Sequence, residues 1–124
     1  MKEEKIQQET ARQIAETAYN ALDSKKGMDV TLLEVSEQTI LADYFVLATG
    51  TANTHVRALA DEVEFKLKEI GIEPMHIEGT SGNSWTLLDY GCVVVHIFTS
   101  QARDFYKLER LWSGNEIKLG GSEE

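Results

Sequence analysis

A buried strand followed closely by an amphipathic helix limits the folds that this chain can adopt. The run DYFVLATG, residues 43–50, is apolar almost throughout and is typical of a largely buried strand. Apolar side chains then recur every three or four residues over 56–70, which predicts a helix with one buried stripe. Asn53 or Thr54 is expected to cap this helix, and Gly71 to end it.

The rest of the chain continues this alternation of helices and strands. Further helices are predicted over 4–22 and 100–112, and further strands over 28–34, 75–78, 84–89 and 93–98. A tight hairpin is expected between the last two strands. The predicted fold class is therefore α/β, with a single mixed sheet of about five strands and packed helices. We expect one domain over residues 1–113 and a flexible acidic tail over residues 114–124.

The charge balance of the chain narrows the class of partner. The 124 residues carry a formal net charge of -9. Nucleic acids and anionic membranes are bound by clustered Lys and Arg, so we expect no membrane partner and no extensive direct nucleic-acid binding. A basic protein is the partner that this charge favours. The single cysteine forms no internal disulfide, and no charged-then-apolar signal segment opens the chain, so a cytoplasmic location is expected.

The junction ATGTANTHV, residues 48–56, is a candidate anion site. Free backbone N–H groups and the positive end of a helix point outward at such a junction. A P-loop also needs a lysine after its glycines, and a dinucleotide loop needs three spaced glycines. This segment has one glycine and no lysine, so a structural turn before a helix is favoured.

Histidines and carboxylates suggest a metal site as a second candidate. His76 and Glu78 share one face of a strand, and His96 and Asp89 could join them. Zinc ligands usually occur at compact, repeated spacings, and a lone cysteine provides no Cys pair. We therefore expect no metal ion, and we expect His96 to be a hydrogen-bonded histidine in the core or on a sheet face.

The sequence contains no recognisable set of catalytic residues. The chain lacks a G-x-S-x-G motif, and Cys92 enters an apolar strand, where burial keeps a thiol inert. Nucleotidyl transfer needs carboxylates that converge at strand ends, but Asp43 and Asp89 belong to different segments. A binding module without catalytic activity or cofactor is the favoured class. The alternative is a nucleotide- or metal-binding enzyme with its site near Gly50 and Asp43.

The segment NSWTLLDY, residues 83–90, combines two aromatic residues with one carboxylate. Strand alternation separates its side chains into two sets: Trp85, Leu87 and Asp89 on one face, and Thr86, Leu88 and Tyr90 on the other. Trp and Tyr beside a carboxylate have the composition of a protein-interface hot spot. Packing of Trp85 or Tyr90 beneath the last helix is an equally valid interpretation of composition alone.

Four blocks of sequence occur in a characteristic order within residues 8–113: DYFVLATGTANTHVRALADEV, HIEG, WTLLDYGCVVVHIF and RDFYKLERLW. Together they resemble the signature blocks of the ribosomal silencing factor family, RsfS, also called Iojap-like. The resemblance implies a nucleotidyltransferase-like fold without the catalytic residues. It also implies binding to the large ribosomal subunit through its fourteenth large-subunit protein, a steric block of subunit joining, and repression of translation under nutrient limitation.

The resemblance further implies which side chains contact the partner. The residues that it indicates are Trp85, Leu87, Leu88, Asp89, Tyr90, Arg103, Tyr106 and Lys107. Trp85 and Tyr90 would be the desolvated anchors, and Asp89 would accept from a basic residue. One position departs from the family pattern, because Cys92 stands where the family commonly has a second aspartate in DYGDVVVH. A homodimer closed through the Trp85 face is a further hypothesis.

Overall fold

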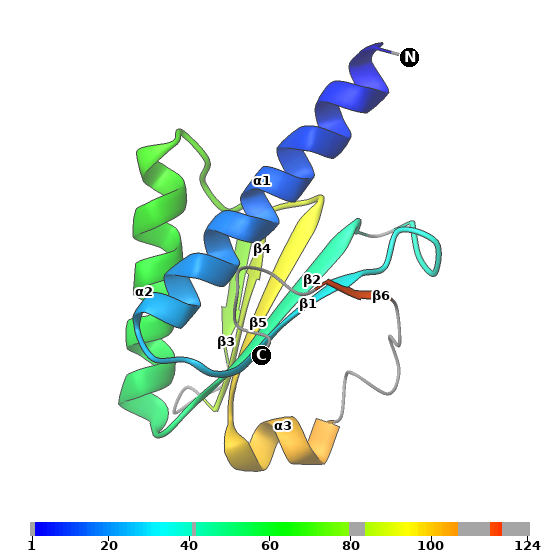
Figure 1. Ribbon diagram of the computed structural model, residues 1–124. Coiled ribbons are helices and arrows are strands. Elements are labelled where there is room, and N and C mark those ends of the chain that lie inside the picture. The colour runs from blue at the N-terminus through cyan, green and yellow to red at the C-terminus, as the bar shows by residue number, and fades with distance from the viewer. Residues whose placement is uncertain (1, 41, 80–83, 107–114, 118–124) are drawn as a thin grey trace.

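Three helices and six strands make up the part of the chain that the computed structural model describes, residues 2–40, 42–79, 84–106 and 115–117 (Figure 1). The helices are α1 (Lys2–Ser24), α2 (Asn53–Glu69) and α3 (Ser100–Tyr106). The strands are β1 (Met28–Glu34), β2 (Tyr44–Gly50), β3 (His76–Gly79), β4 (Trp85–Asp89), β5 (Val93–Thr99) and β6 (Asn115–Ile117). No described helix combines the length and the apolar character needed to span a bilayer.

The strands form one open sheet in the order β3-β4-β5-β2-β1-β6. The two central strands, β2 and β5, run parallel, whereas every other neighbouring pair is antiparallel. Parallel neighbours need a crossover connection, and α2 lies in the connection between these two. The α/β fold class with a single mixed sheet is therefore confirmed, with one strand more than the sequence predicts.

The additional strand, β6, comes from the segment that the sequence predicts to be a flexible tail. It pairs antiparallel with β1 and places Ile117 opposite Leu32. Ile117 also packs against the core. Three residues at a sheet edge are too few to produce an alternating pattern, which explains why the prediction missed them. Residues 114 and 118–124 of the predicted tail lie outside the described residues.

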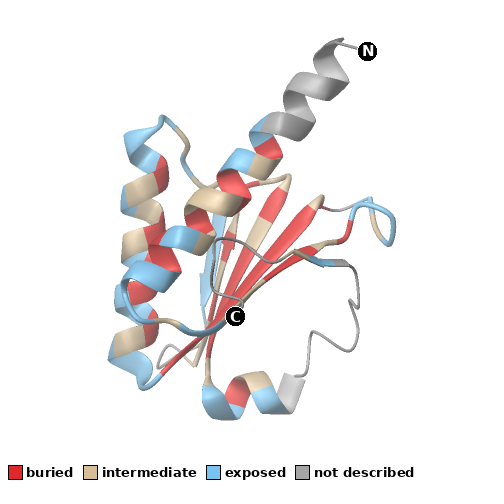
Figure 2. Cartoon of the chain, in the orientation of Figure 1, coloured by how far each residue is buried: buried red, intermediate tan, exposed pale blue. Residues whose placement is uncertain are grey.

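Helices α1 and α2 cover one face of the sheet, and the main core lies between them and the strands (Figure 2). Burial confirms the predicted stripes of α1 and α2 except at Ile70, which is 45% exposed just after α2. The fully buried side chains of the two helices are Ala11, Ala15, Ala18, Leu22, Val56, Leu59, Val63 and Leu67. Fully burying a Val or Leu side chain contributes about 1.5–3 kcal/mol, so this layer supplies much of the stability. The predicted helix over 100–112 lies outside the described residues beyond Tyr106.

The two ends of α2 are formed differently. Its N-cap is Ala52, with no side-chain hydrogen bond, so the prediction that Asn53 or Thr54 caps the helix is wrong. The chain passes close to the helix just before it, since a Cβ on Gly50 would lie only 2.9 Å from the backbone nitrogen of Val56. At the other end, Gly71 adopts a φ of 83° and ends the helix as predicted.

The opposite face of the sheet carries a smaller apolar cluster. Its buried members are Leu33, Val35, Ala42, Phe45, Leu47, Phe98 and Ala102, and Trp85 and Val94 pack against them. Of the described helices, only α3 contributes to this cluster, through Ala102. This face, which we call the open face, is therefore the less completely covered side of the sheet in the described part of the chain.

Candidate partner-binding face

Strand β4 presents alternate side chains to the two faces of the sheet, as predicted. Trp85, Leu87 and Asp89 are half-buried, whereas Thr86 and Leu88 between them are buried. Trp85 packs with the cluster of the open face, and Leu88 belongs to the core beneath the helices. The three half-buried residues, which we call the β4 strip, therefore lie together on the open face.

Trp85 is held in place by aromatic neighbours on β5. Its indole N–H donates to Nδ1 of His96 at 3.2 Å, and its ring centroid lies 5.2 Å from that of Phe98. His96 is buried and stacks with Phe98, and Phe45 meets it edge-on. Burial lowers the pKa of His96 to about 4, so the imidazole is neutral and carries its proton on Nε2. The prediction of a hydrogen-bonded histidine is confirmed.

Asp89 combines exposure with a structural role. Its Oδ1 accepts a hydrogen bond at 2.8 Å from the backbone N–H of Gly91, in the turn between β4 and β5. Gly91 adopts a φ of 85°, which glycine accommodates without strain. Pairing of β3 with β4 sets His76 opposite Asp89 and Glu78 opposite Leu87. The strip is thus apolar at Trp85 and Leu87 and becomes acidic toward Asp89.

Two of the residues indicated by the resemblance point to the other face. Leu88 has no exposed surface, and Tyr90 is only 6% exposed; both lie in the core beneath the helices. They cannot touch a partner on the open face, because each is one step out of phase with the β4 strip. Their contribution to this face is therefore indirect, through the packing that holds β4.

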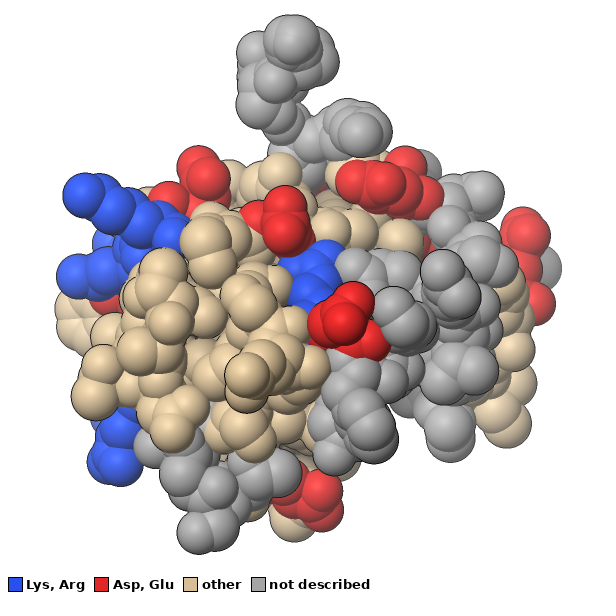
Figure 3. All heavy atoms as spheres, turned by 90° about the horizontal axis from the view of Figure 1, so that it is seen from below, with Lys and Arg blue, Asp and Glu red and all other residues tan. Residues whose placement is uncertain are grey.

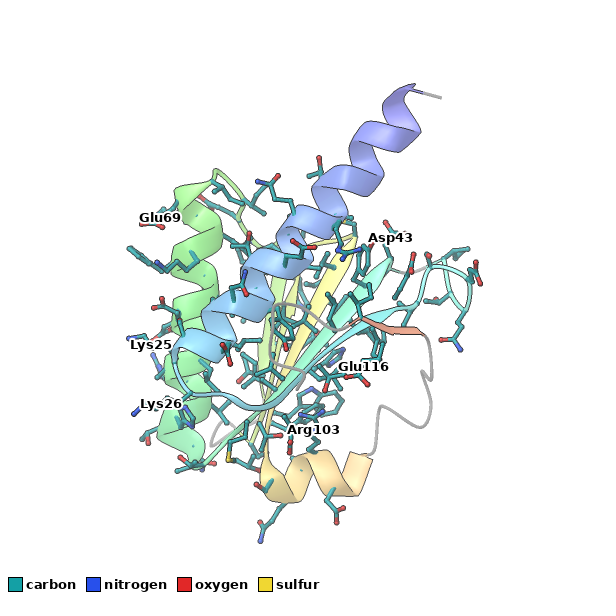
Figure 4. All side chains as sticks on the ribbon, in the orientation of Figure 1. Lys25, Lys26, Asp43, Glu69, Arg103 and Glu116 are labelled. Atoms are coloured by element: carbon teal, nitrogen blue, oxygen red, sulfur yellow. The ribbon has the colours of Figure 1, made fainter. Side chains whose placement is uncertain are left out.

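The three remaining candidates differ in how they are placed. Arg103 of α3 donates to the backbone oxygen of Asp29 at 2.7 Å and to the hydroxyls of Thr49 and Thr31 at 3.0 and 3.1 Å (Figure 4). This guanidinium therefore ties α3 to β1 and β2. The side chain of Tyr106 and all of Lys107 lie outside the described residues.

Cys92, the departure from the family pattern, lies in the Tyr90–Cys92 turn. Its side chain is half-buried and packs against the core beneath the helices. Burial and the neighbouring Asp43 raise the pKa of the thiol, which keeps it protonated. Its backbone oxygen accepts from the N–H groups of Asp43 and Tyr44, so this position also fixes the start of β2.

The two residues of the alternative enzyme site lie at opposite ends of β2. Asp43 precedes the first residue of this strand, and Gly50 is its last residue. Seven residues of strand span about 20 Å, so the two positions cannot hold one phosphate or metal ion together. Among the described residues, no three His, Cys, Asp or Glu side chains are grouped as metal ligands. His76 instead pairs with Glu78 at 2.7 Å on exposed β3.

Charged side chains are unevenly distributed on the face seen from below. In the view from below, Lys and Arg side chains gather mainly toward one edge, and Asp and Glu side chains are dispersed among uncharged ones (Figure 3). A broad basic surface, such as nucleic acids require, does not occupy the part of this face formed by described residues.

An open mixed sheet with two helices on one face and an aromatic cluster on the other defines this molecule as an α/β domain. The family model described as "Ribosomal silencing factor during starvation" matches residues 8–123. The chain belongs to this family.

Individual relatives agree with that assignment. The ribosomal silencing factor RsfS of Chromobacterium violaceum is 40% identical over 105 residues, which cover 85% of this chain and 86% of that protein. The RsfS of Bacillus subtilis is 36% identical over 101 residues, which cover 82% and 86%. A crystal structure of a Chromobacterium violaceum protein superposes with a TM-score of 0.80 at 38% identity, covering 90% of this chain and 95% of that one.

Proposed function

We propose that this protein binds the large ribosomal subunit through its fourteenth large-subunit protein, and that the β4 strip is the contact surface. Bound there, in the cytoplasm, the domain prevents the small subunit from joining and so represses translation when nutrients are limited. The mechanism is steric and needs no chemistry, because two bodies cannot occupy the same surface. Membership of the ribosomal silencing factor family supports this function.

The placement of Trp85, Leu87 and Asp89 on one half-exposed face carries the proposal. Interfaces gain most of their affinity from a few large side chains that lose water on binding, and these sit in well-packed surroundings. Trp85 fits this description, since His96 and Phe98 fix its ring before any partner arrives. A fixed ring loses little conformational freedom on association.

The acidic balance of the chain supports a basic protein partner. A net charge of -9 speeds encounter with a positively charged surface and disfavours bare nucleic acid. Asp89 is half-exposed, so the oxygen that does not hold the hairpin can accept from an arginine or lysine. Apolar contact at Leu87 and charge at Asp89 would then act side by side.

Co-sedimentation with purified large subunits tests the proposal. Leu87→Lys places a positive charge on the β4 strip, and we expect binding to weaken about tenfold or more, equivalent to about 1.4 kcal/mol. Ile70→Lys is the matched control, because Ile70 is 45% exposed at the end of α2 on the other side of the sheet. Equal binding by the two variants, with both folded by circular dichroism, would show that the β4 strip is not the contact surface.

A further inference from the structure

Strand β3 is the edge of the sheet on the side of β4 (Figure 1). All four of its residues, His76–Gly79, are exposed, and among the described strands it pairs only with β4. The backbone groups on the outer side of an edge strand have no partner within the sheet, so they are available to a strand of another chain.

The hydrogen bonds of β4 determine which backbone groups of β3 point outward. The carbonyl oxygen of Ser84, just before β4, accepts from the N–H of Thr99 on β5. Backbone groups of successive residues in a strand point alternately to the two neighbouring strands, so those of Leu87 point toward β3, where Glu78 lies opposite. By the same alternation, the N–H and C=O groups of Ile77 point away from the sheet.

The side chains of β3 differ between the two faces of the sheet. His76 and Glu78 lie on the open face, and the imidazole Nε2 of His76 is 2.7 Å from a carboxylate oxygen of Glu78. Ile77 lies on the helix side, opposite Leu88, and is 47% exposed. One face of this edge therefore carries a basic and an acidic group, and the other carries an exposed apolar side chain.

We propose that β3 pairs antiparallel with β3 of a second copy of this chain, with the two-fold axis at Ile77. The outward N–H and C=O groups of Ile77 then bond to the same groups of the partner's Ile77, and the two apolar side chains meet on the helix side. On the open face, His76 lies opposite the partner's Glu78, and Glu78 lies opposite the partner's His76. A two-fold axis makes this contact twice.

Charge selects this register over its neighbours. The open faces of both copies must lie on the same side, so the allowed registers differ by shifts that keep side chains on their own face. A shift in one direction sets Glu78 against the partner's Glu78, and a shift in the other direction sets His76 against the partner's His76. Like groups directly opposite each other destabilise a strand pair, so only the register centred on Ile77 is complementary.

This dimer goes beyond the proposed function and does not depend on it. It also differs from a homodimer closed through the Trp85 face, because it uses backbone groups of the sheet edge. Two β3 strands would separate the two β4 strips on one continuous face by about 14 Å. Because so few residues pair, we expect a weak association that depends on protein concentration.

Sedimentation velocity of the full chain, between about 10 µM and about 1 mM, tests the proposal. We expect the average mass to rise from monomer toward dimer across this range. His76→Glu gives an acidic edge, and His76→Lys combined with Glu78→Lys gives a basic edge. Each variant alone should raise the dissociation constant about fivefold or more, whereas an equimolar mixture of the two should form a heterodimer, because every Glu then faces a Lys.

Two further variants separate the edge from the rest of the surface. Ile77→Pro removes an outward N–H group, which an edge strand tolerates, and should leave a folded monomer by circular dichroism. Gln38→Glu adds an acidic group at an exposed position outside β3 and should dimerise as the natural protein does. The proposal is overturned if the natural protein stays monomeric throughout, if the acidic and basic variants do not associate, or if Leu87→Lys abolishes a dimer that His76→Glu leaves intact.

Discussion

Protonation of the buried His96 should contribute a measurable part of the loss of folding stability in acid. The imidazole is buried between aromatic rings, and its Nδ1 already accepts the indole N–H of Trp85. Protonation would place a charge in an apolar cluster and replace that acceptor with a donor. The folded state therefore resists protonation and has a pKa of about 4 at this residue, whereas the unfolded chain takes up the proton near 6.5.

The expected loss of stability follows from that difference. Stability from the neutral imidazole is fully present above pH 6.5 and declines as the pH falls toward 4, because only the unfolded state gains the proton in that range. One unit of pKa difference corresponds to about 1.4 kcal/mol, so the loss reaches about 3 kcal/mol below both values. Between about pH 7.5 and about pH 5 it amounts to about 2 kcal/mol.

Urea unfolding, monitored by far-ultraviolet circular dichroism at both pH values, measures this loss. Other groups titrate in the same range, so the natural protein is compared with His96→Gln, which cannot take up the proton. We expect the natural protein to lose about 2 kcal/mol more than the variant between the two pH values. His76→Gln, at an exposed position, is the control and should behave as the natural protein. An equal loss in the natural protein and His96→Gln would refute the assignment of a buried, neutral imidazole.

Two stability predictions concern the connections between elements. Arg103→Ala should lower the free energy of unfolding, measured by urea titration, by about 2 kcal/mol, because the hydrogen bonds that join α3 to β1 and β2 are lost. Arg57→Ala is the control: Arg57 is exposed, and its replacement should change the free energy of unfolding by less than about 0.5 kcal/mol. Gly50→Ala should cost about 1–3 kcal/mol, measured as a lower melting temperature, because its Cβ would meet Val56 at 2.9 Å. Gly79→Ala is its control, since that Cβ would sit 3.5 Å from its nearest neighbour. A Gly50→Ala protein as stable as Gly79→Ala would contradict the close packing of β2 on α2.

Much of the fold could be predicted because the elements between residues 28 and 99 are long enough to show a period. The strand at 44–50 and the helix at 53–69 appear close to their expected bounds, since burial of one stripe or one run leaves a clear pattern in composition. The turn at Gly50 before α2 was predicted, but the cap was not, because Ala52 is the N-cap and has no side chain that can accept a hydrogen bond. The three-residue edge strand β6 could not be predicted because it is too short to show an alternating pattern.

The candidate face was only partly predictable. Alternation groups Trp85 with Asp89, but it does not say which face of β4 the helices cover, and that depends on the strand order. Tyr90 was therefore proposed as a surface anchor and proved to be buried. The support of Trp85 by β5 could have been predicted from the sequence, because a two-residue hairpin turn at Gly91 and Cys92 sets Trp85 opposite Phe98. His96, two residues earlier, then lies diagonally across from the indole.

The order of strands in this sheet also determines when the β4 strip can be completed while the chain is being synthesised. Tyr44 pairs with Val93 in the centre of the sheet, and Leu32 pairs with Ile117 of the edge strand β6. Pairings between such distant parts of a chain form slowly and only after both partners have left the exit tunnel. The rings that steady Trp85 belong to β5, and β5 is fixed by its pairing with β2. A nascent copy therefore lacks a finished β4 strip until β5 has left the exit tunnel and has paired with β2.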